Sequence, residues 1–243
     1  DGCLCLVGSE MCIRDSCSIG VLEKNHDSQW AAASFVQPKK TGDVRLLTDF
    51  RKLNVVLKRQ PFPLPKISDL LLKLKGFQYA TALDLSMGYY HIPLDKAAQE
   101  LCTTIFPWGK YRYKRLPMGI SSAPDIFQAI MASILGDFDF VRVYIDDILI
   151  ISNGSFEDHM QKLHQVLTRL EQRGFRANVR KCFFARDSLE YLGYWLTRHG
   201  IQPQPKKVEA ICRLSAPKDK RQLRHFLGMV NYYRDMWRGT LLP

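Results

Sequence analysis

Two adjacent aspartates interrupt an apolar, strand-forming run in Val141-Arg142-Val143-Tyr144-Ile145-Asp146-Asp147-Ile148-Leu149-Ile150-Ile151. Val, Ile and Tyr at this density favour β-strands, so the stretch predicts two buried strands that meet in a tight turn. We expect Asp146 and Asp147 at the tip of that turn, because the aspartate side chain bonds readily to nearby backbone groups. Taken alone, the pair fits an ordinary hairpin turn.

A third aspartate, Asp84, lies in a similar setting, within Ala80-Thr81-Ala82-Leu83-Asp84-Leu85. Carboxylates among apolar strand residues are costly unless they are paired or bound to a metal. Three acids at strand ends would repel one another unless divalent cations lay between them. Because Mg²⁺ prefers carboxylate oxygens, water and substrate phosphates, the three acids predict a magnesium site.

The composition restricts the class of protein. The chain has 243 residues, 46% of them hydrophobic and 24% charged, which is typical of a globular protein with a substantial core. Its 35 Lys and Arg against 24 Asp and Glu give a net charge of +11, which favours a polyanionic partner, nucleic acid before an anionic membrane. Apolar runs fall short of the ~18 residues of a membrane span, and a secretory signal is not evident. Of the seven cysteines, four lie in the first 17 residues, and the other three, Cys102, Cys182 and Cys212, are scattered without metal-ligand spacing; we interpret the cysteines as reduced intracellular thiols.

The first 17 residues differ from the rest of the chain. They hold four cysteines, show no periodicity, and resemble a translated sequencing adaptor; a small metal-binding knuckle is the alternative. We therefore leave residues 1–17 out of the fold, as an adaptor-like artefact or a disordered leader.

The remaining sequence alternates short strand patterns with helical ones, which predicts an α+β fold. Prolines at 61, 63 and 65 predict an extended connector, and Pro65 suits the start of a helix that carries Ile67, Leu70, Leu71 and Leu74 at helical spacing and ends at Gly76. A helix with a capping box at Ser155 is expected to stop at Gly174, with His159 and His164 on or near its solvated side. Strands are expected at 35–36 and 44–47, joined by a turn at 38–43, and at 103–106 and 111–116, joined by a hairpin turn at 107–110. Residues 189–196 predict a strand pair or hairpin, and basic helices are expected at 206–214 and 220–236.

Five short motifs occur in order along the chain. They are Thr48-Asp49-Phe50-Arg51-Lys52-Leu53-Asn54, Leu83-Asp84-Leu85-Ser86-Met87-Gly88-Tyr89-Tyr90, Leu116-Pro117-Met118-Gly119 with Ala123-Pro124, Tyr144-Ile145-Asp146-Asp147, and Phe226-Leu227-Gly228-Met229-Val230-Asn231-Tyr232-Tyr233-Arg234. In this order they resemble the reverse transcriptase domain of retroelements, most closely that of gypsy-type LTR retrotransposon polyproteins. The resemblance extends from about residue 20 to the end of the chain.

The resemblance implies a right-hand polymerase with fingers, a palm made of an antiparallel sheet backed by helices, and a helical partial thumb. Residues 18–197 would form the reverse transcriptase domain, with fingers and palm interleaved, and 198–243 the partial thumb. The implied activity is that of an RNA-directed DNA polymerase, a nucleotidyltransferase that extends a primer with deoxynucleotides.

The resemblance also implies roles for single residues. Asp84, Asp146 and Asp147 would be catalytic and, with the backbone of Leu85, would hold two Mg²⁺ ions, one acting on the primer 3′-hydroxyl and one on the triphosphate. Lys181 matches a position at which a lysine is sometimes proposed as a general acid. The remaining implied contacts are Arg45 and Lys40 (or Lys39) with the triphosphate, Tyr89 as the steric gate against ribonucleotides, Met118 and Gln128 with the nucleotide pocket, and Leu192 and Gly193 with the primer end.

The expected partners are an RNA or DNA template with its primer and deoxynucleoside triphosphates, with no membrane, inside an intracellular and cytoplasmic retroelement particle. Ribonuclease H and integrase domains are expected in the full polyprotein but not in this chain, which we interpret as a fragment. Asp125 departs from the family pattern, and its negative charge near the nucleotide pocket puts nucleotide affinity in doubt.

Two alternatives stay open at this stage. One is a catalytically silent, truncated remnant that only binds nucleic acid. The other is an RNA-dependent RNA polymerase, against which Tyr89 argues.

Overall fold

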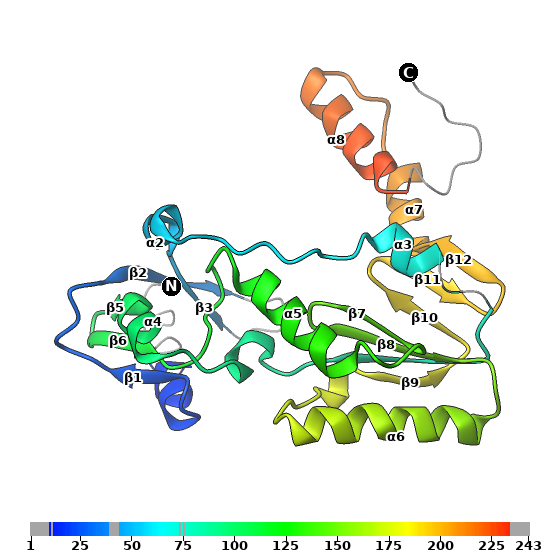
Figure 1. Ribbon diagram of the computed structural model, residues 1–243. Coiled ribbons are helices and arrows are strands. Elements are labelled where there is room, and N and C mark those ends of the chain that lie inside the picture. Colours follow the sequence, from blue (N-terminus) through cyan, green and yellow to red (C-terminus); the bar gives the residue numbers. More distant parts are fainter. Residues whose placement is uncertain (1–9, 11, 39–43, 73, 75, 234–243) are drawn as a thin grey trace. The chain divides into compact units, whose positions relative to one another are not determined.

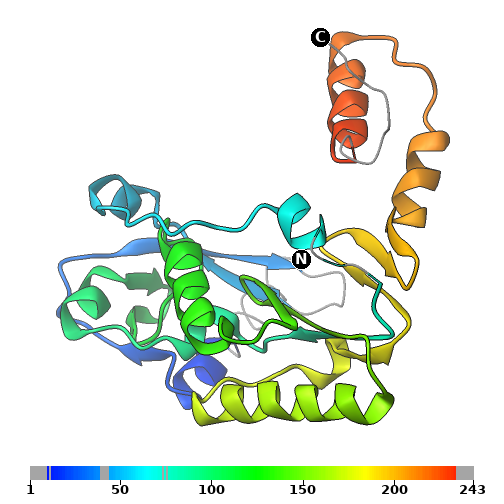
Figure 2. The ribbon, with the colours of Figure 1, turned by 45° about the vertical axis from the view of Figure 1, so that its right-hand side comes forward.

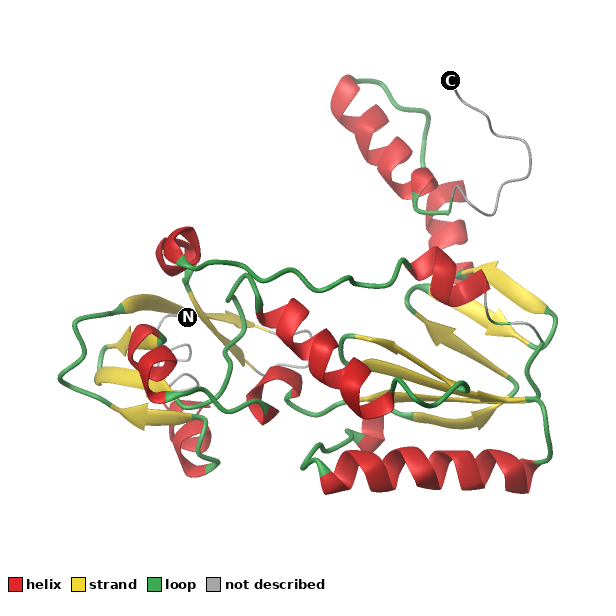
Figure 3. Ribbon diagram, viewed as in Figure 1, coloured by secondary structure: helices red, strands yellow, loops and turns green. Residues whose placement is uncertain are grey.

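The computed structural model describes residues 10, 12–38, 44–72, 74 and 76–233. Its contacts divide the chain into two units, and each unit combines two separate stretches of sequence. The first unit comprises Asp1–Pro63 and Ser86–Ser133, and the second comprises Leu64–Leu85 and Ile134–Pro243. Figure 1 labels the elements, and Figure 3 distinguishes helices from strands.

A five-stranded sheet organises the first unit, in the order β1-β6-β5-β2-β3. The β2–β3 and β5–β6 pairs are antiparallel hairpins, as the sequence predicts, whereas β2 and β5 pair in parallel. The turn between β2 and β3, residues 39–43, lies outside the described residues. The strands are β1 (Leu22–Lys24), β2 (Ala32–Pro38), β3 (Val44–Thr48), β5 (Thr103–Phe106) and β6 (Gly109–Tyr113).

Short helices accompany this sheet. The core of the unit includes Leu22, Phe50, Leu53 and Tyr113, each no more than 4% exposed. The helices are α2 (Arg51–Val56), the 3₁₀ helix η1 (Gly88–His91), α4 (Lys96–Leu101) and α5 (Ala123–Leu135), the last of which begins in the first unit.

Part of residues 1–17, which we left out of the predicted fold, lies within the described residues. Residues 12–18 are helical, and Ile13 is 3% exposed and belongs to the same core as Leu22 and Phe50. This part of the segment therefore packs on the first unit.

A four-stranded antiparallel sheet, in the order β7-β8-β4-β9, organises the second unit. Helix α6 runs along this sheet (Figures 1 and 2) and buries one stripe of apolar side chains, Leu163, Val166 and Leu170. The expected α+β class with an antiparallel sheet backed by helices is confirmed. The elements are β4 (Tyr79–Asp84), β7 (Val141–Tyr144), β8 (Asp147–Ser152), β9 (Phe183–Arg186) and α6 (Phe156–Gln172).

Helix α6 has the predicted ends. The Ser155 hydroxyl accepts a hydrogen bond from the Asp158 N–H at 3.2 Å, and Gly174 beyond the helix has φ +76°. His164 is exposed, as expected.

The prediction for His159 is wrong, because this side chain is completely buried. Its ring nitrogens lie 2.7 Å from the Thr81 hydroxyl on β4 and 2.8 Å from the Ser152 hydroxyl on β8. Burial lowers the pKa of His159. The neutral ring can serve as donor on one side and acceptor on the other, which satisfies both nitrogens inside the core.

The remaining elements of the second unit include a small sheet, β10-β11-β12. The predicted strand pair at 189–196 is confirmed as the β10–β11 hairpin. The helix predicted to start at Pro65 and end at Gly76 is shorter than expected: it spans Ile67–Leu72, and Leu74 is buried outside it. The elements are β10 (Ser188–Tyr191), β11 (Tyr194–Thr197), β12 (Gly200–Pro203), α3 (Ile67–Leu72), η2 (Val179–Lys181), α7 (Pro205–Cys212) and α8 (Lys220–Asn231).

Across the described ranges, none of the helices combines the length and the apolar character needed to span a bilayer.

Candidate active site

The aspartate hairpin has its turn one residue earlier than the sequence suggests. Tyr144 pairs with Asp147, so Ile145 and Asp146 form the two-residue turn and Asp147 is the first residue of β8. Ile145 has φ +54°, a conformation that is strained for a β-branched residue. Asp146 is exposed at the turn, and Asp147 lies within the paired strands.

Asp84 and Asp147 face each other across the sheet. They are the last residue of β4 and the first residue of β8, and they are directly paired in the antiparallel register. Opposed side chains in such a pair have Cβ atoms about 4.5–5.5 Å apart, and like charges there repel. The Leu85 N–H donates to the Asp146 carbonyl at 3.4 Å, which joins the end of β4 to the turn. The fold therefore concentrates negative charge at one end of this sheet.

The titration of Asp147 reflects this setting. Burial, reinforced by the charges of Asp146 and Asp84, raises the pKa of Asp147 from 3.8 to about 6, although Lys181 opposes the shift. Behind it, Tyr191 is 3% exposed, and its hydroxyl donates to the Asp147 carbonyl at 3.3 Å. Burial raises the pKa of Tyr191, so the phenol remains a protonated donor.

Lys181 supplies a positive charge to the site. Its ammonium Nζ lies 3.4 Å from both carboxylate oxygens of Asp84. Lys181 is the last residue of η2, and the Asn178 N–H just before η2 donates to the Asp84 carbonyl at 2.8 Å. Because Leu85 also bridges Ala177, the segment that carries Lys181 is fixed to the end of β4.

A groove of about 540 Å³ contains both paired aspartates. The β10–β11 turn, Leu192 and Gly193, also lines it, so the structure brings the predicted primer-contacting turn into the same groove as two of the predicted catalytic acids. Arg180 and Lys181 add basic charge to the wall.

The carboxylate oxygens of this groove are suited to a divalent cation, but they do not form a complete set of metal ligands. In the part of the chain that the structure describes, no three His, Cys, Asp or Glu side chains converge as metal ligands. The case for a metal rests on the facing carboxylates of Asp84 and Asp147 and on the raised pKa of Asp147, which marks negative charge that a cation would stabilise. Hard oxygen donors of this kind suit Mg²⁺.

The other predicted site residues belong to the first unit. Arg45 is exposed on β3, and Lys40 lies outside the described residues. Tyr89 in η1 contacts the buried Phe127 edge-on, with ring centroids 5.3 Å apart. Gln128 is 4% exposed on α5, and Met118 is half-buried in a loop.

That loop is held by Asn54. The Asn54 side-chain amide donates to the Gly119 carbonyl at 2.8 Å, and its oxygen accepts from the Ser121 N–H at 2.9 Å. Gly119 has φ +98°, and a Cβ there would lie 3.3 Å from the Thr48 carbonyl, so a side chain would be strained. Met118 is therefore presented by a constrained loop.

The negative charge of Asp125, which was expected to weaken nucleotide binding, is compensated by neighbouring residues. Asp125 is 2% exposed, and Arg59 donates to both of its oxygens, at 2.9 and 3.3 Å. The Phe62 N–H adds a third hydrogen bond at 3.1 Å. The hydrogen bonds from Arg59 hold the pKa of Asp125 below its usual value. Arg59 thus compensates the charge of Asp125. Because Arg59 and Phe62 both belong to the proline-rich connector, their hydrogen bonds to Asp125 anchor that connector.

Three tyrosines that support the site were not predicted as functional residues. Tyr191 contacts the backbone of Asp147, whereas Tyr232 and Tyr233 contact the β10–β11 turn. Their signal in the sequence was weak, because tyrosines in strands and helices are most often core residues.

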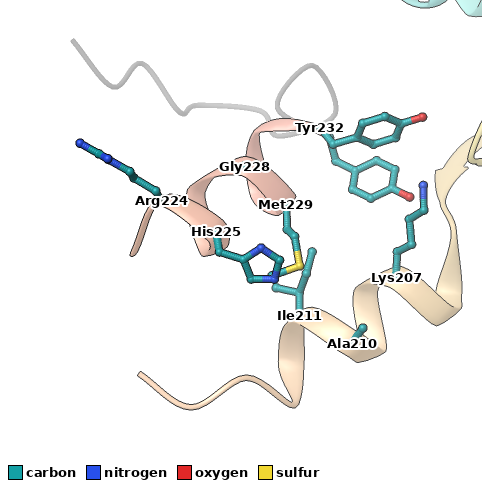
Figure 4. A pocket seen from close by; sticks show the side chains of 9 residues that line it. Lys207, Ala210, Ile211, Arg224, His225, Gly228, Met229 and Tyr232 are labelled. Atoms are coloured by element: carbon teal, nitrogen blue, oxygen red, sulfur yellow. The ribbon is translucent and has the colours of Figure 1, made fainter. Parts of the chain in front are cut away.

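A second cavity of about 540 Å³ lies between α7 and α8 (Figure 4). Ile211 and Met229 give it an apolar lining, with Lys207, Arg224 and His225 at other positions around it. It contains none of the acids that face the first groove.

Comparison with known proteins gives a consistent match. The family model described as "Reverse transcriptase (RNA-dependent DNA polymerase)" matches residues 37–196. The Retrovirus-related Pol polyprotein from transposon opus of Drosophila melanogaster is 36% identical over 204 residues, covering 82% of this chain and 20% of that protein. The Transposon Tf2-3 polyprotein of Schizosaccharomyces pombe is 34% identical over 217 residues, covering 88% of this chain and 16% of that protein. The chain thus spans at most about a fifth of these curated relatives.

Solved structures share the fold. The foamy viral protease-reverse transcriptase in complex with dsDNA matches with a TM-score of 0.87 at 25% identity, covering 93% of this chain and 47% of that one. The same viral protein in complex with an RNA/DNA hybrid matches with a TM-score of 0.84 at 24% identity, covering 94% and 31%. The polymerase fold implied by the sequence motifs is confirmed.

Proposed function

This chain belongs to the reverse transcriptase (RNA-dependent DNA polymerase) family, and on that premise we propose that it extends a primer with deoxynucleotides on an RNA or DNA template. The observation that carries the proposal is the pairing of Asp84 with Asp147 in a groove that the Leu192–Gly193 turn also lines. The related viral protease-reverse transcriptase forms complexes with dsDNA and with an RNA/DNA hybrid, which supports the choice of substrate.

Phosphoryl transfer depends on positioning and charge neutralisation, and this chain offers residues for both. Asp84, Asp146 and Asp147, with the backbone of Leu85, would hold two Mg²⁺ ions. When bound, such ions lower the pKa of an attacking hydroxyl and neutralise the triphosphate and the leaving pyrophosphate. Lys181, already at Asp84, adds positive charge beside them.

The first unit would supply the nucleotide contacts. Arg45 and Lys40 would bind the triphosphate, and the Tyr89 ring would exclude a 2′-hydroxyl. Met118 and Gln128 would line the nucleotide pocket. We assign residues 18–197 to interleaved fingers and palm and 198–243 to a partial thumb, within a retrotransposon polyprotein that also carries ribonuclease H and integrase domains and acts in an intracellular particle.

Primer extension on poly(rA)/oligo(dT) with dTTP and Mg²⁺ tests the proposal. The wild-type chain should extend the primer, and Asp147→Asn should not. Asp139→Asn is the matched control, because it removes the same charge from an exposed position just before β7 and should retain activity.

The other outcomes are equally informative. Extension by Asp147→Asn at the wild-type rate would refute the site. If the folded wild-type chain binds primer–template in a salt-sensitive way but never extends it, the alternative of a silent nucleic-acid-binding remnant replaces the proposal. Incorporation of ribonucleotides as fast as deoxynucleotides would refute the role of Tyr89.

A further inference from the structure

The turn between β10 and β11 is strained. Tyr191 pairs with Tyr194, so Leu192 and Gly193 alone connect the strands, and both have left-handed backbones, with φ +49° and +78°. Two left-handed residues suit a two-residue hairpin, but leucine pays a steric penalty there that glycine and asparagine largely avoid. Something besides local preference must hold Leu192 in this conformation.

Two hydroxyl groups from the end of α8 hold it. The Tyr232 hydroxyl donates to the Leu192 carbonyl at 2.7 Å, and the Tyr233 hydroxyl donates to the Gly193 carbonyl at 2.8 Å. Burial raises the pKa of both phenols, so they remain protonated donors. Each carbonyl of the turn is thus bound by its own tyrosine.

The two tyrosines are themselves well fixed. Tyr233 is 2% exposed, and its oxygen accepts from the Gln204 N–H at 3.2 Å. Tyr232 stacks on Tyr194 with ring centroids 5.5 Å apart, and the Lys207 ammonium lies 4.4 Å from the Tyr232 ring centroid. Figure 4 shows Lys207 extending toward Tyr232.

Gly193 fits this arrangement for a second reason. A Cβ at Gly193 would lie 2.6 Å from the Tyr232 hydroxyl oxygen and 2.9 Å from the Lys207 ammonium nitrogen. A side chain there would therefore displace the tyrosine that holds the turn.

We propose that Tyr232 and Tyr233 are positioning residues for the primer end, whose hydroxyls fix the Leu192–Gly193 turn where it lines the groove beside Asp84 and Asp147. This inference rests on the proposed function. In a trans peptide the C=O and N–H point in opposite directions, so a fixed Leu192 carbonyl also fixes the Gly193 N–H on the other side of the turn. That N–H is a backbone donor suited to a phosphate oxygen of the primer.

The contact itself can be measured without activity. The sequence has three Leu-Gly and two Gly-Tyr pairs, so a label of ¹³C on the carbonyl of the first residue and ¹⁵N on the second resolves each peptide by NMR. Tyr232→Phe should shift the Leu192 carbonyl resonance, and Tyr233→Phe should shift that of Gly193. Tyr194→Phe is the matched control for the Leu192 resonance, because its hydroxyl donates to the Tyr232 carbonyl and not to the turn, and the Leu192–Gly193 label is unaffected by this change.

Single-turnover extension then separates positioning from mere stability. The Tyr232→Phe/Tyr233→Phe double variant should extend bound primer about tenfold more slowly, because small displacements of a reacting end are costly. Its dissociation constant for primer–template, from fluorescence anisotropy, should stay unchanged, and Tyr194→Phe should match the wild type in both measurements.

Unchanged carbonyl resonances, or an extension rate equal to that of Tyr194→Phe, would overturn the inference. If the wild-type chain extends no primer, the proposed function and the positioning role fail together, and the resonances then report whether the tyrosine contacts exist without it.

Discussion

In the metal-free protein, the charged Asp147 carboxylate should destabilise the folded state near neutral pH, so Asp147→Asn should be more stable than the wild type. Its folded-state pKa is raised from 3.8 to about 6, which means that the folded state binds the proton more tightly than the unfolded state does. The stabilisation from this proton is fully present below pH 3.8 and is lost as the pH rises through about 6. Asparagine keeps the shape and carries no charge.

The pKa shift sets the size of the effect. A rise from 3.8 to about 6 corresponds to at most about 3 kcal/mol, at 1.36 kcal/mol per unit. Because Asp147 is partly exposed, solvent screening reduces this to about 1–2 kcal/mol. For a chain of this size the unfolding midpoint should rise by about 2–8 °C.

Thermal unfolding followed by circular dichroism in EDTA tests the prediction. Asp147→Asn should unfold above the wild type at pH 7.5 and together with it at pH 3.5, while Asp139→Asn follows the wild type at both. Excess Mg²⁺ should then stabilise the wild type more than Asp147→Asn. An equal or lower midpoint for Asp147→Asn at pH 7.5 would refute the reasoning that repulsion and burial destabilise this carboxylate.

Three further predictions concern single contacts. His159→Phe should lower the free energy of unfolding by about 2–4 kcal/mol in urea, because the Ser152 and Thr81 hydroxyls lose their hydrogen bonds to the ring and Thr81 keeps only the one that it accepts from the Ala185 N–H. Since the pKa of His159 is lowered, wild-type stability should also fall as the pH drops below 6.5, and the variant should lack this fall. Leu192→Asn should be more stable than Leu192→Ala by about 1 kcal/mol in urea unfolding, because both variants lose the packing of the leucine on the core but asparagine suits a left-handed turn better; equal stability of the two variants would contradict the assigned strain. Asp125→Asn should speed trypsin cleavage after Arg59, because the connector loses its anchor, and an unchanged cleavage rate would argue against that role.

The strands and most helices were predictable because their signals are local. Alternation of side chains and turn residues mark a hairpin within a few positions, and an aspartate among β-branched residues is conspicuous. The register of the aspartate hairpin was not predictable in this way. Local preference places both aspartates in the turn, but pairing of β8 with β4 makes Asp147 a strand residue and forces Ile145 into the turn.

The partners that satisfy buried polar side chains were also not predicted from the sequence. His159 has the sequence context of a solvated helix position, and only Thr81 and Ser152, on two strands, make its burial acceptable. Asp125 is similar, since Arg59 neutralises it from far along the chain. Such pairs are decided by tertiary contacts that helical or strand periodicity does not record.

The interleaved order of the two units also determines when each part can fold during synthesis. Strand β4 leaves the ribosome well before β8 and β9, and between them the chain must first complete the second stretch of the first unit. At 5–20 residues per second, β4 waits roughly 3–14 s for β8. During that interval Ala80 and Leu83, which end at most 2% exposed, belong to an unpaired strand. Nascent chains halted between Asp84 and Asp147 should therefore be the most aggregation-prone lengths of this protein.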